Sequence, residues 1–258
     1  MKIVYATTYE DMSLRVATIV ADKIRFNPRL VIALPTGATP LGTFRELARM
    51  HHEELLDFSG VTSFNIDEYV PLCPDDPRSF FYFLHDNLYK EINIPSERTF
   101  VPAVGRPDTD QVCRDYEKQI ERRGGIELAL LGIGVNGHIG FNEPGSELSA
   151  WTHVAELSES TIETNARFFS SRAEVPRSAI TMGLATILRS RKILLIANGK
   201  AKAEIMARLL NGNVVTPALP ASFLLTHPDA TVVVDGEAAA RIAVPANLEN
   251  TLARETMS

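Results

Sequence analysis

A histidine and a glutamate lie within a glycine-rich stretch at residues 131–145, directly after the apolar run 126–130. His138 and Glu143 are five residues apart across an expected turn, close enough for the carboxylate to orient the imidazole. A glycine-rich loop at the carboxyl end of a buried strand is a common ligand-binding position in open α/β sheets. The pattern predicts proton transfer at this loop, and a tight loop with solvated side chains is the alternative.

Two acids, Asp67 and Glu68, follow a second apolar run at residues 61–66. The carboxyl end of a buried strand is typical of catalytic groups, since it places them beside the desolvating interior. In the alternative interpretation, Asp67 caps the next element and Glu68 is solvated.

Two junctions between an expected strand and an expected helix suit a phosphate group. One follows the run 30–34, and the other places Lys200 after the run 193–197. Such a junction offers free backbone N–H groups and the positive end of a helix to an anion, and Arg167 adds a second cation. The alternatives are an ordinary turn and two surface cations. The first junction consists of Thr36, Gly37, Ala38 and Thr39.

Strand-like apolar runs and helical stripes alternate along the chain, which predicts an α/β fold. We expect one domain over residues 1–258, with a doubly wound, mostly parallel sheet and right-handed crossovers. Residues 145–175 are polar, with one expected helix at 160–169, and they predict a lid-like insertion after the catalytic loop. The clearest expected strands are 3–6, 30–34, 61–66, 126–130, 193–197 and 230–235, and the clearest helices are 9–26, 41–51, 79–90, 108–123 and about 201–210.

Composition narrows the classes of partner and cofactor. A formal net charge of −6 without a block of basic residues argues against nucleic acid. Cys73 and Cys113 form neither a metal-binding spacing nor a disulfide framework, and no dinucleotide-binding motif opens a helix, so we expect no metal and no cofactor. A polar start and the lack of a long apolar run predict a cytoplasmic protein without a membrane contact. A small phosphorylated molecule undergoing proton transfer remains as the expected substrate.

Three blocks of the sequence, residues 34–40, 64–69 and 134–145, resemble the signature motifs of glucosamine-6-phosphate deaminases in order and spacing. The resemblance runs through nearly the whole chain and implies an α/β sheet of the modified Rossmann type. It also implies conversion of glucosamine 6-phosphate to fructose 6-phosphate and ammonia, in amino-sugar catabolism. By position, Asp67 resembles the base that moves the C2 proton to C1, and His138, held by Glu143, resembles the group that opens the sugar ring. The loop 36–39, Arg167 and Lys200 would then hold the 6-phosphate.

Two departures from that family pattern affect the hydrogen-bonded residues around His138 and the allosteric regulation. Some members carry aspartate where this chain has Asn136, which can orient His138 through a hydrogen bond but cannot share a proton. Allosteric members use basic side chains shortly after the loop to bind N-acetylglucosamine 6-phosphate between subunits, whereas His153 and Ala155 stand in that region here. We therefore expect a modified proton relay in which Asn136 orients His138, and no activation by N-acetylglucosamine 6-phosphate. The family ranges from monomers to hexamers, so a homo-oligomer is compatible with the sequence.

Three other functions share parts of this pattern. A 6-phosphogluconolactonase has a similar Gly-His loop, but residues 141–144 have the deaminase form. A deaminase or isomerase for galactosamine 6-phosphate would use the same chemistry, and the epimer cannot be read from these motifs. A non-enzymatic sugar-phosphate sensor would tolerate Asp67→Asn with its function unchanged.

Overall fold

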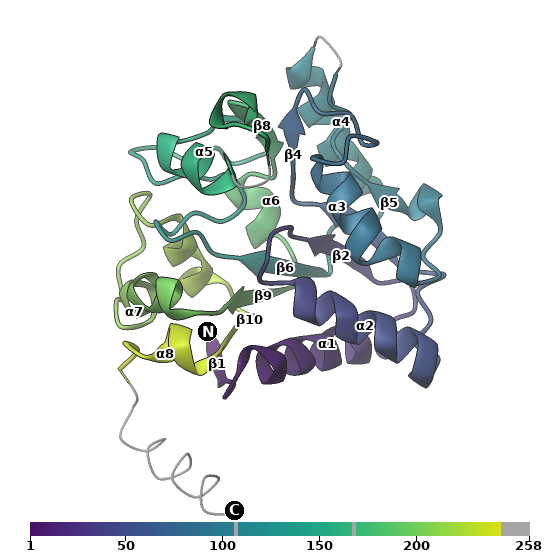
Figure 1. Ribbon diagram of the computed structural model, residues 1–258, viewed down its shortest axis with the longest axis horizontal. Helices are drawn as coiled ribbons and strands as arrows, with labels where there is room; N and C mark the ends of the chain where they lie inside the picture. Colours follow the sequence, from purple (N-terminus) through teal and green to yellow (C-terminus); the bar gives the residue numbers. More distant parts are fainter. Residues whose placement is uncertain (106–107, 167–168, 244–258) are drawn as a thin grey trace, which may run out of the picture.

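The computed structural model describes residues 1–105, 108–166 and 169–243. A seven-stranded parallel sheet forms its centre, with the strand order β1-β10-β9-β6-β2-β3-β5 (Figure 1). The strands are β1 (Lys2–Tyr5), β2 (Val31–Leu34), β3 (Thr62–Asn65), β5 (Thr99–Phe100), β6 (Leu128–Gly132), β9 (Lys192–Ala197) and β10 (Ala230–Val234).

Helices cover both faces of this sheet, because its strands are apolar on both sides. On β2, for example, Ala33 packs into one core while Leu34 packs into the other. One face is covered by α1 (Tyr9–Phe26), α2 (Leu41–Glu54) and α3 (Phe80–Asn87). The other is covered by α4 (Thr109–Arg122), α6 (Leu184–Leu188), α7 (Ala203–Leu210) and α8 (Gly236–Ala239). Short 3₁₀ turns lie at Tyr89–Glu91, Ser96–Arg98, Arg172–Glu174, Lys200–Lys202 and Pro220–Thr226.

The order of strands reverses between β2 and β6. From β2 the chain continues outward through β3 to β5, and from β6 it continues in the opposite direction through β9 to β10. The loops that leave the carboxyl ends of β2 and β6 therefore diverge and open a crevice, which is the usual ligand position in doubly wound sheets.

A second, antiparallel sheet was not predicted from the sequence. It consists of β4 (Asp67–Val70), β8 (Ser178–Thr181) and β7 (His153–Glu156), in that order. Only Ile66 separates β4 from β3, so the chain passes from one sheet to the other within a single residue. Local patterning did not reveal this sheet because its strands mix polar and apolar residues and β4 pairs with a strand more than a hundred residues away.

The predicted α/β class and its mostly parallel, doubly wound sheet are confirmed. The helix predicted at 9–26 matches α1, and the one predicted at 41–51 continues to Glu54. The segment 145–175 is more ordered than predicted, since it contains β7 as well as α5 (Glu159–Asn165). Its suggested role as a lid stays a prediction.

Candidate active site

A cavity of about 460 Å³ opens at the carboxyl edge of the sheet, beside the point where the strand order reverses. Its wall comes from the loops after β2 and β6, from β4 and α3, and from α5. The loop 36–39, Asp67, Asn136 and His138 all line it, although they are far apart in the sequence. The fold thus brings together three of the predicted chemical elements in one cavity.

Asp67 is the first residue of β4 and is 8% exposed. Burial, followed by the charge of the adjacent Glu68, raises the pKa of Asp67 to about 8. A carboxylate with a raised pKa is a stronger base, and its place in the cavity wall gives it access to a bound molecule. The structure therefore favours the catalytic interpretation of Asp67 over a helix-capping one.

Glu68 has a different environment, because successive side chains of a strand point to opposite faces. It does not line the cavity and is 0% exposed. Its carboxylate accepts hydrogen bonds from the backbone N–H groups of Tyr69, Phe80 and Phe81, at 2.8–2.9 Å. Burial raises the pKa of Glu68 to about 7, and these three donors oppose that shift. Glu68 thus fastens β4 to the start of α3, which excludes the alternative interpretation of a solvated side chain.

His138 lies in the loop after β6, where Gly134 gives its ring room and Gly137 turns the backbone beside it. A Cβ on Gly134 would lie 2.4 Å from the imidazole, so only glycine allows this close approach. Gly137 has φ +95°, in the left-handed region that glycine adopts without strain. These glycines explain why the loop is glycine-rich, since they fold it back around the histidine.

Glu143 lies beside His138, with 3.3 Å between its Oε1 and the histidine Nδ1. Two shorter hydrogen bonds hold the carboxylate in place: Asn136 Nδ2 donates to Oε2 at 2.7 Å, and Thr161 Oγ1 donates to Oε1 at 2.6 Å. Asn136 also accepts from the His138 backbone N–H at 3.2 Å. Burial would raise the pKa of Glu143, but His138, Thr161 and Asn136 outweigh it and hold that pKa at about 2.

Sequence reasoning missed Thr161. It lies in α5, 18 residues after Glu143, and is buried. No motif marks it, because a threonine in a polar segment has no pattern that distinguishes it from a surface residue. Its hydroxyl also accepts from Ser158 Oγ at 2.9 Å, so the start of α5 is linked to the carboxylate that faces His138.

The predicted phosphate loop, Thr36 to Thr39, forms one side of the cavity. Gly37 has φ +93°, which turns the loop between β2 and α2. The four backbone N–H groups of this loop donate to no described residue of the chain. They are thus available to an anion near the start of α2.

The structure places Lys202, and not the predicted Lys200, in the cavity wall. Lys200 is exposed, and its backbone N–H donates to Glu237. Lys202 donates from Nζ to the carbonyl of Ile133 at 2.6 Å. The two lysines are the first and last residues of the 3₁₀ turn Lys200–Lys202, and their side chains lie in different places. The run Lys-Ala-Lys did not predict this turn. Arg167, the other predicted cation, lies outside the described residues.

Four aromatic rings form one part of the cavity wall. Tyr69 and Phe80 have ring centroids 4.4 Å apart, and Phe141 and Phe169 lie 6.0 Å and 5.8 Å from Tyr69. All four residues line the cavity. These rings come from β4, α3, the loop after β6 and the segment after α5, so they join elements that the sequence keeps apart.

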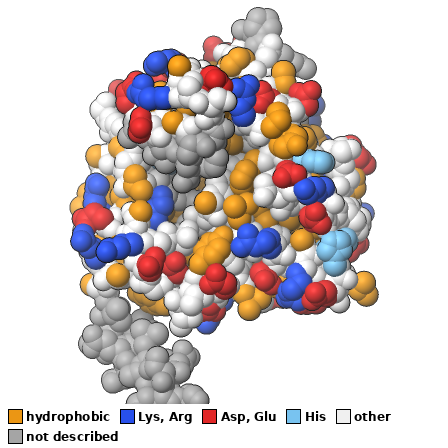
Figure 2. Space-filling view, in the orientation of Figure 1, with side chains coloured by type: hydrophobic (Ala, Val, Ile, Leu, Met, Phe, Trp, Pro, Cys, Tyr) orange, Lys and Arg blue, Asp and Glu red, His pale blue; other side chains and the backbone are white. Residues whose placement is uncertain are grey.

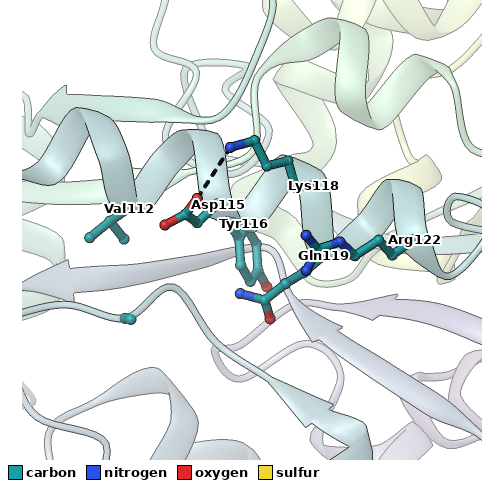
Figure 3. A pocket seen from close by; sticks show the side chains of 7 residues that line it. Val112, Asp115, Tyr116, Lys118, Gln119 and Arg122 are labelled. Carbon is teal, nitrogen blue, oxygen red and sulfur yellow. Dashed lines mark ion pairs between the residues drawn. The ribbon is translucent and has the colours of Figure 1, made fainter.

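A second cavity, of about 330 Å³, lies along α4 (Figure 3). Lys118 and Asp115 form an ion pair of 3.5 Å in its wall, and the side chains of Gln119 and Arg122 lie beside them. Among the described residues that line this cavity there is no histidine and no buried carboxylate. The groups suited to proton transfer are therefore at the first cavity.

The part of the chain that the structure describes has neither a metal-binding cluster nor a membrane-spanning helix. No three histidine, cysteine or acidic side chains in these residues gather in a way that would bind a metal ion. None of the described helices is long and apolar enough to span a bilayer. On the face shown in Figure 2, acidic and basic side chains of the described residues are interspersed.

The fold and the cavity define a doubly wound α/β protein with an acid/base pocket at the reversal of its strand order. Residues 6–234 match the family model described as glucosamine-6-phosphate isomerases/6-phosphogluconolactonase. The chain belongs to this family. It is 47% identical to a glucosamine-6-phosphate deaminase of Thermoanaerobacter pseudethanolicus, over 94% of this chain and 95% of that one. It is 49% identical to a deaminase of the same name from Geobacillus sp., over 92% and 94%.

Solved structures agree with the family assignment. A monomeric glucosamine-6-phosphate deaminase superimposes with a TM-score of 0.91 at 44% identity, covering 93% of this chain and 100% of that one. The 6-phosphogluconolactonase of Trypanosoma brucei superimposes with a TM-score of 0.73 at 22% identity, covering 94% and 98%. The second likeness shows the shared fold alone.

Proposed function

We propose that this chain converts glucosamine 6-phosphate and water to fructose 6-phosphate and ammonia, as a step of amino-sugar catabolism in the cytoplasm. The observation that carries the proposal is the meeting of Asp67, His138 and the loop 36–39 in one cavity. Near-full-length identity of 47% to proteins named glucosamine-6-phosphate deaminase supports the choice of substrate.

Ring opening comes first, and His138 is suited to it. A proton must move from the O1 hydroxyl to the ring oxygen O5, and an imidazole can accept and donate a proton near neutral pH. Glu143, ionised and held by Asn136 and Thr161, would orient the ring and stabilise its protonated form. Asn136 adds orientation to this relay but no charge.

Asp67 would then isomerise the open chain. The C1 aldehyde makes the C2 proton acidic, and the carboxylate takes that proton while O1 receives a proton from the substrate's own ammonium group, which leaves an enolamine. Return of the proton to C1 produces an imine at C2, which water hydrolyses to the ketone and ammonia. Burial of Asp67 favours each transfer, because it keeps the carboxylate poorly solvated and basic.

The phosphate would lie opposite these groups. The N–H groups of the loop 36–39 provide donors without a side-chain charge, and Lys202 at the cavity wall provides the cation that the sequence placed at Lys200. Arg167 remains a proposed second cation. Thr161, Asn165 and Phe169 line the cavity from the segment 145–175, which supports the proposal that this insertion covers the substrate.

Ammonia release by purified protein tests the proposal. Glucosamine 6-phosphate and galactosamine 6-phosphate should be compared, with Asp67→Asn as control. Release from the gluco epimer, abolished in the variant, is the expected result. Release from the galacto epimer alone would keep the mechanism and change the substrate. No ammonia release from either sugar phosphate, together with hydrolysis of 6-phosphogluconolactone, would overturn the proposal.

A further inference from the structure

The start of α2 has an unusual cap. Its N-cap residue, Pro40, supplies no side-chain hydrogen bond to the helix. Instead, the backbone N–H of Gly42 donates to the hydroxyl oxygen of Tyr9, at 2.7 Å. Tyr9 is the first residue of α1, 33 positions earlier in the chain. A tertiary contact thus replaces the local cap that most helices have.

The same hydroxyl also holds the loop before the helix. It donates to the carbonyl oxygens of Ala38 and Thr39, each 3.2 Å from the hydroxyl oxygen, so these two acceptors share one hydrogen. Tyr9 therefore accepts from the helix and donates to the loop, with one oxygen atom serving both. In a trans peptide the Thr39 N–H points away from the Ala38 carbonyl, so a fixed Ala38 carbonyl also fixes the direction of the Thr39 N–H, and Thr39 lines the cavity.

Close packing of α1 on α2 brings the tyrosine within reach. A Cβ on Gly42 would lie 2.2 Å from Ser13 Oγ and 3.0 Å from Tyr9 Cε1. Only glycine at this position lets the two helices approach so closely. The position of Tyr9 is thus built into the helix contact and does not depend on its hydroxyl alone.

A second contact supports the loop from the opposite side. Thr39 Oγ1 donates to Asn198 Oδ1 at 2.7 Å, from the residue that follows β9. The loop is therefore held between α1 and the carboxyl end of the sheet. Loss of one support leaves the other in place, so removal of the Tyr9 hydroxyl should weaken the arrangement without abolishing it.

We infer that Tyr9 is a positioning residue for phosphate recognition: its hydroxyl holds the loop 36–39 in the conformation that presents backbone N–H groups to the substrate. This inference rests on the proposed function for the identity of the anion. Tyr9 does not line the cavity itself, so it acts through the loop.

Tyr9→Phe tests the inference, because phenylalanine keeps the packed ring and removes only the hydroxyl. Tyr82→Phe, at an exposed tyrosine outside the cavity wall, is the matched control. The dissociation constant of glucitol 6-phosphate, an open-chain sugar phosphate without an amine, should rise about tenfold in Tyr9→Phe, as expected for one lost hydrogen bond. The KM for glucosamine 6-phosphate should rise in parallel, with kcat within about twofold.

Amide hydrogen exchange provides a second measurement. Exchange of the Gly42 amide should become at least about fivefold faster in Tyr9→Phe and stay unchanged in Tyr82→Phe, since this N–H loses its acceptor. Affinity for glucitol 6-phosphate equal to that of the wild type would overturn the inference. So would an equal loss of affinity for glucitol, which lacks the phosphate. Because this binding needs no turnover, wild-type protein that releases no ammonia would refute the proposed function while leaving the test of Tyr9 intact.

Discussion

The parallel sheet and the small antiparallel sheet contribute different chemistry to the cavity. The parallel sheet presents loop backbone, in residues 36–39, and the glycine-rich loop that carries His138. The antiparallel sheet presents a side chain, Asp67, backed by aromatic rings. The passage from Asn65 in β3 to Asp67 in β4 joins the two within three residues.

This difference follows from the geometry of the two sheets. Parallel strands end together at one edge, so the following loops and helix starts direct N–H groups to the same place and suit an anion. A strand of the antiparallel sheet passes alongside the cavity, and its alternate side chains face the cavity and the interior. That arrangement buries a carboxylate at the wall and raises its pKa, as it does for Asp67. The comparison predicts that changes in β4 affect turnover, whereas changes around the loop 36–39 affect binding.

Asp67→Asn should have the largest effect. The amide has nearly the same shape but cannot take a proton, so kcat should fall by about 10³-fold or more, whereas affinity for glucitol 6-phosphate should change by less than about twofold. The melting temperature should not fall, because the substitution removes a poorly solvated carboxyl group. Steady-state kinetics, calorimetric binding and thermal melting measure these three results. A loss of binding equal to the loss of turnover would contradict the division between the sheets.

Glu68→Gln should alter both stability and pH dependence. The amide keeps one acceptor oxygen for three backbone donors, so unfolding should become easier by about 2 kcal/mol. Asp67 must be ionised to act as a base, so wild-type kcat/KM should decline as the pH falls through a value well above that of an ordinary carboxyl group. Removal of the neighbouring charge lowers the pKa of Asp67, and this decline should move to lower pH.

Glu147→Gln is the control for that experiment, because it removes a charge from an exposed side chain outside the cavity wall. Its profile should coincide with that of the wild type. A profile for Glu68→Gln that also coincides with the wild type would mean that Asp67 is not the base whose ionisation limits turnover.

Thr161→Val should have a smaller effect, through the His138–Glu143 pair. Valine matches the shape of threonine but loses the 2.6 Å hydrogen bond to Glu143 Oε1, the oxygen that faces His138. We expect kcat/KM to fall about tenfold, because one charge-assisted hydrogen bond is lost. Thr161→Ser keeps the hydroxyl and should restore most of the activity. Equal losses in both variants would indicate a packing effect on α5 instead.

The smallest expected effect is that of N-acetylglucosamine 6-phosphate as an activator. His153 and Ala155 lie in β7, and Ala155 is a buried, uncharged residue that cannot bind a phosphate. Substrate saturation should be hyperbolic, and the acetylated sugar phosphate should leave it unchanged. A sigmoidal curve made hyperbolic by that compound would refute the expectation.

Much of the fold could be predicted from local patterns. The stripe that runs through α1 and the apolar runs of β2, β6 and β9 are long enough for periodicity to identify them. The antiparallel sheet could not be predicted in the same way. Its strands mix polar and apolar residues, whereas β2 is wholly apolar, and β4 pairs with a strand more than a hundred residues away.

The candidate site shows the same division between local and distant information. Asp67 and His138 were predicted because each lies in a recognisable block after a strand, and both line the cavity. The prediction of Lys200 shows the limit of local patterns, since a 3₁₀ turn places Lys202 in the cavity wall instead. Thr161 and Tyr9 were missed, because each acts on a residue at least 18 positions away.

The sequence by itself determined the order of most strands of the parallel sheet and of the longer helices, the glycine-rich and acidic blocks, and a net charge unsuited to nucleic acid. Composition and short-range periodicity carry this information, because they depend on residues within a few turns of one another. The tertiary structure decided that Asp67 faces the cavity while Glu68 is buried behind it, and that Thr161 and Tyr9 support Glu143 and the loop 36–39. These relations depend on the packing of distant elements, which sets the direction, burial and partners of each side chain.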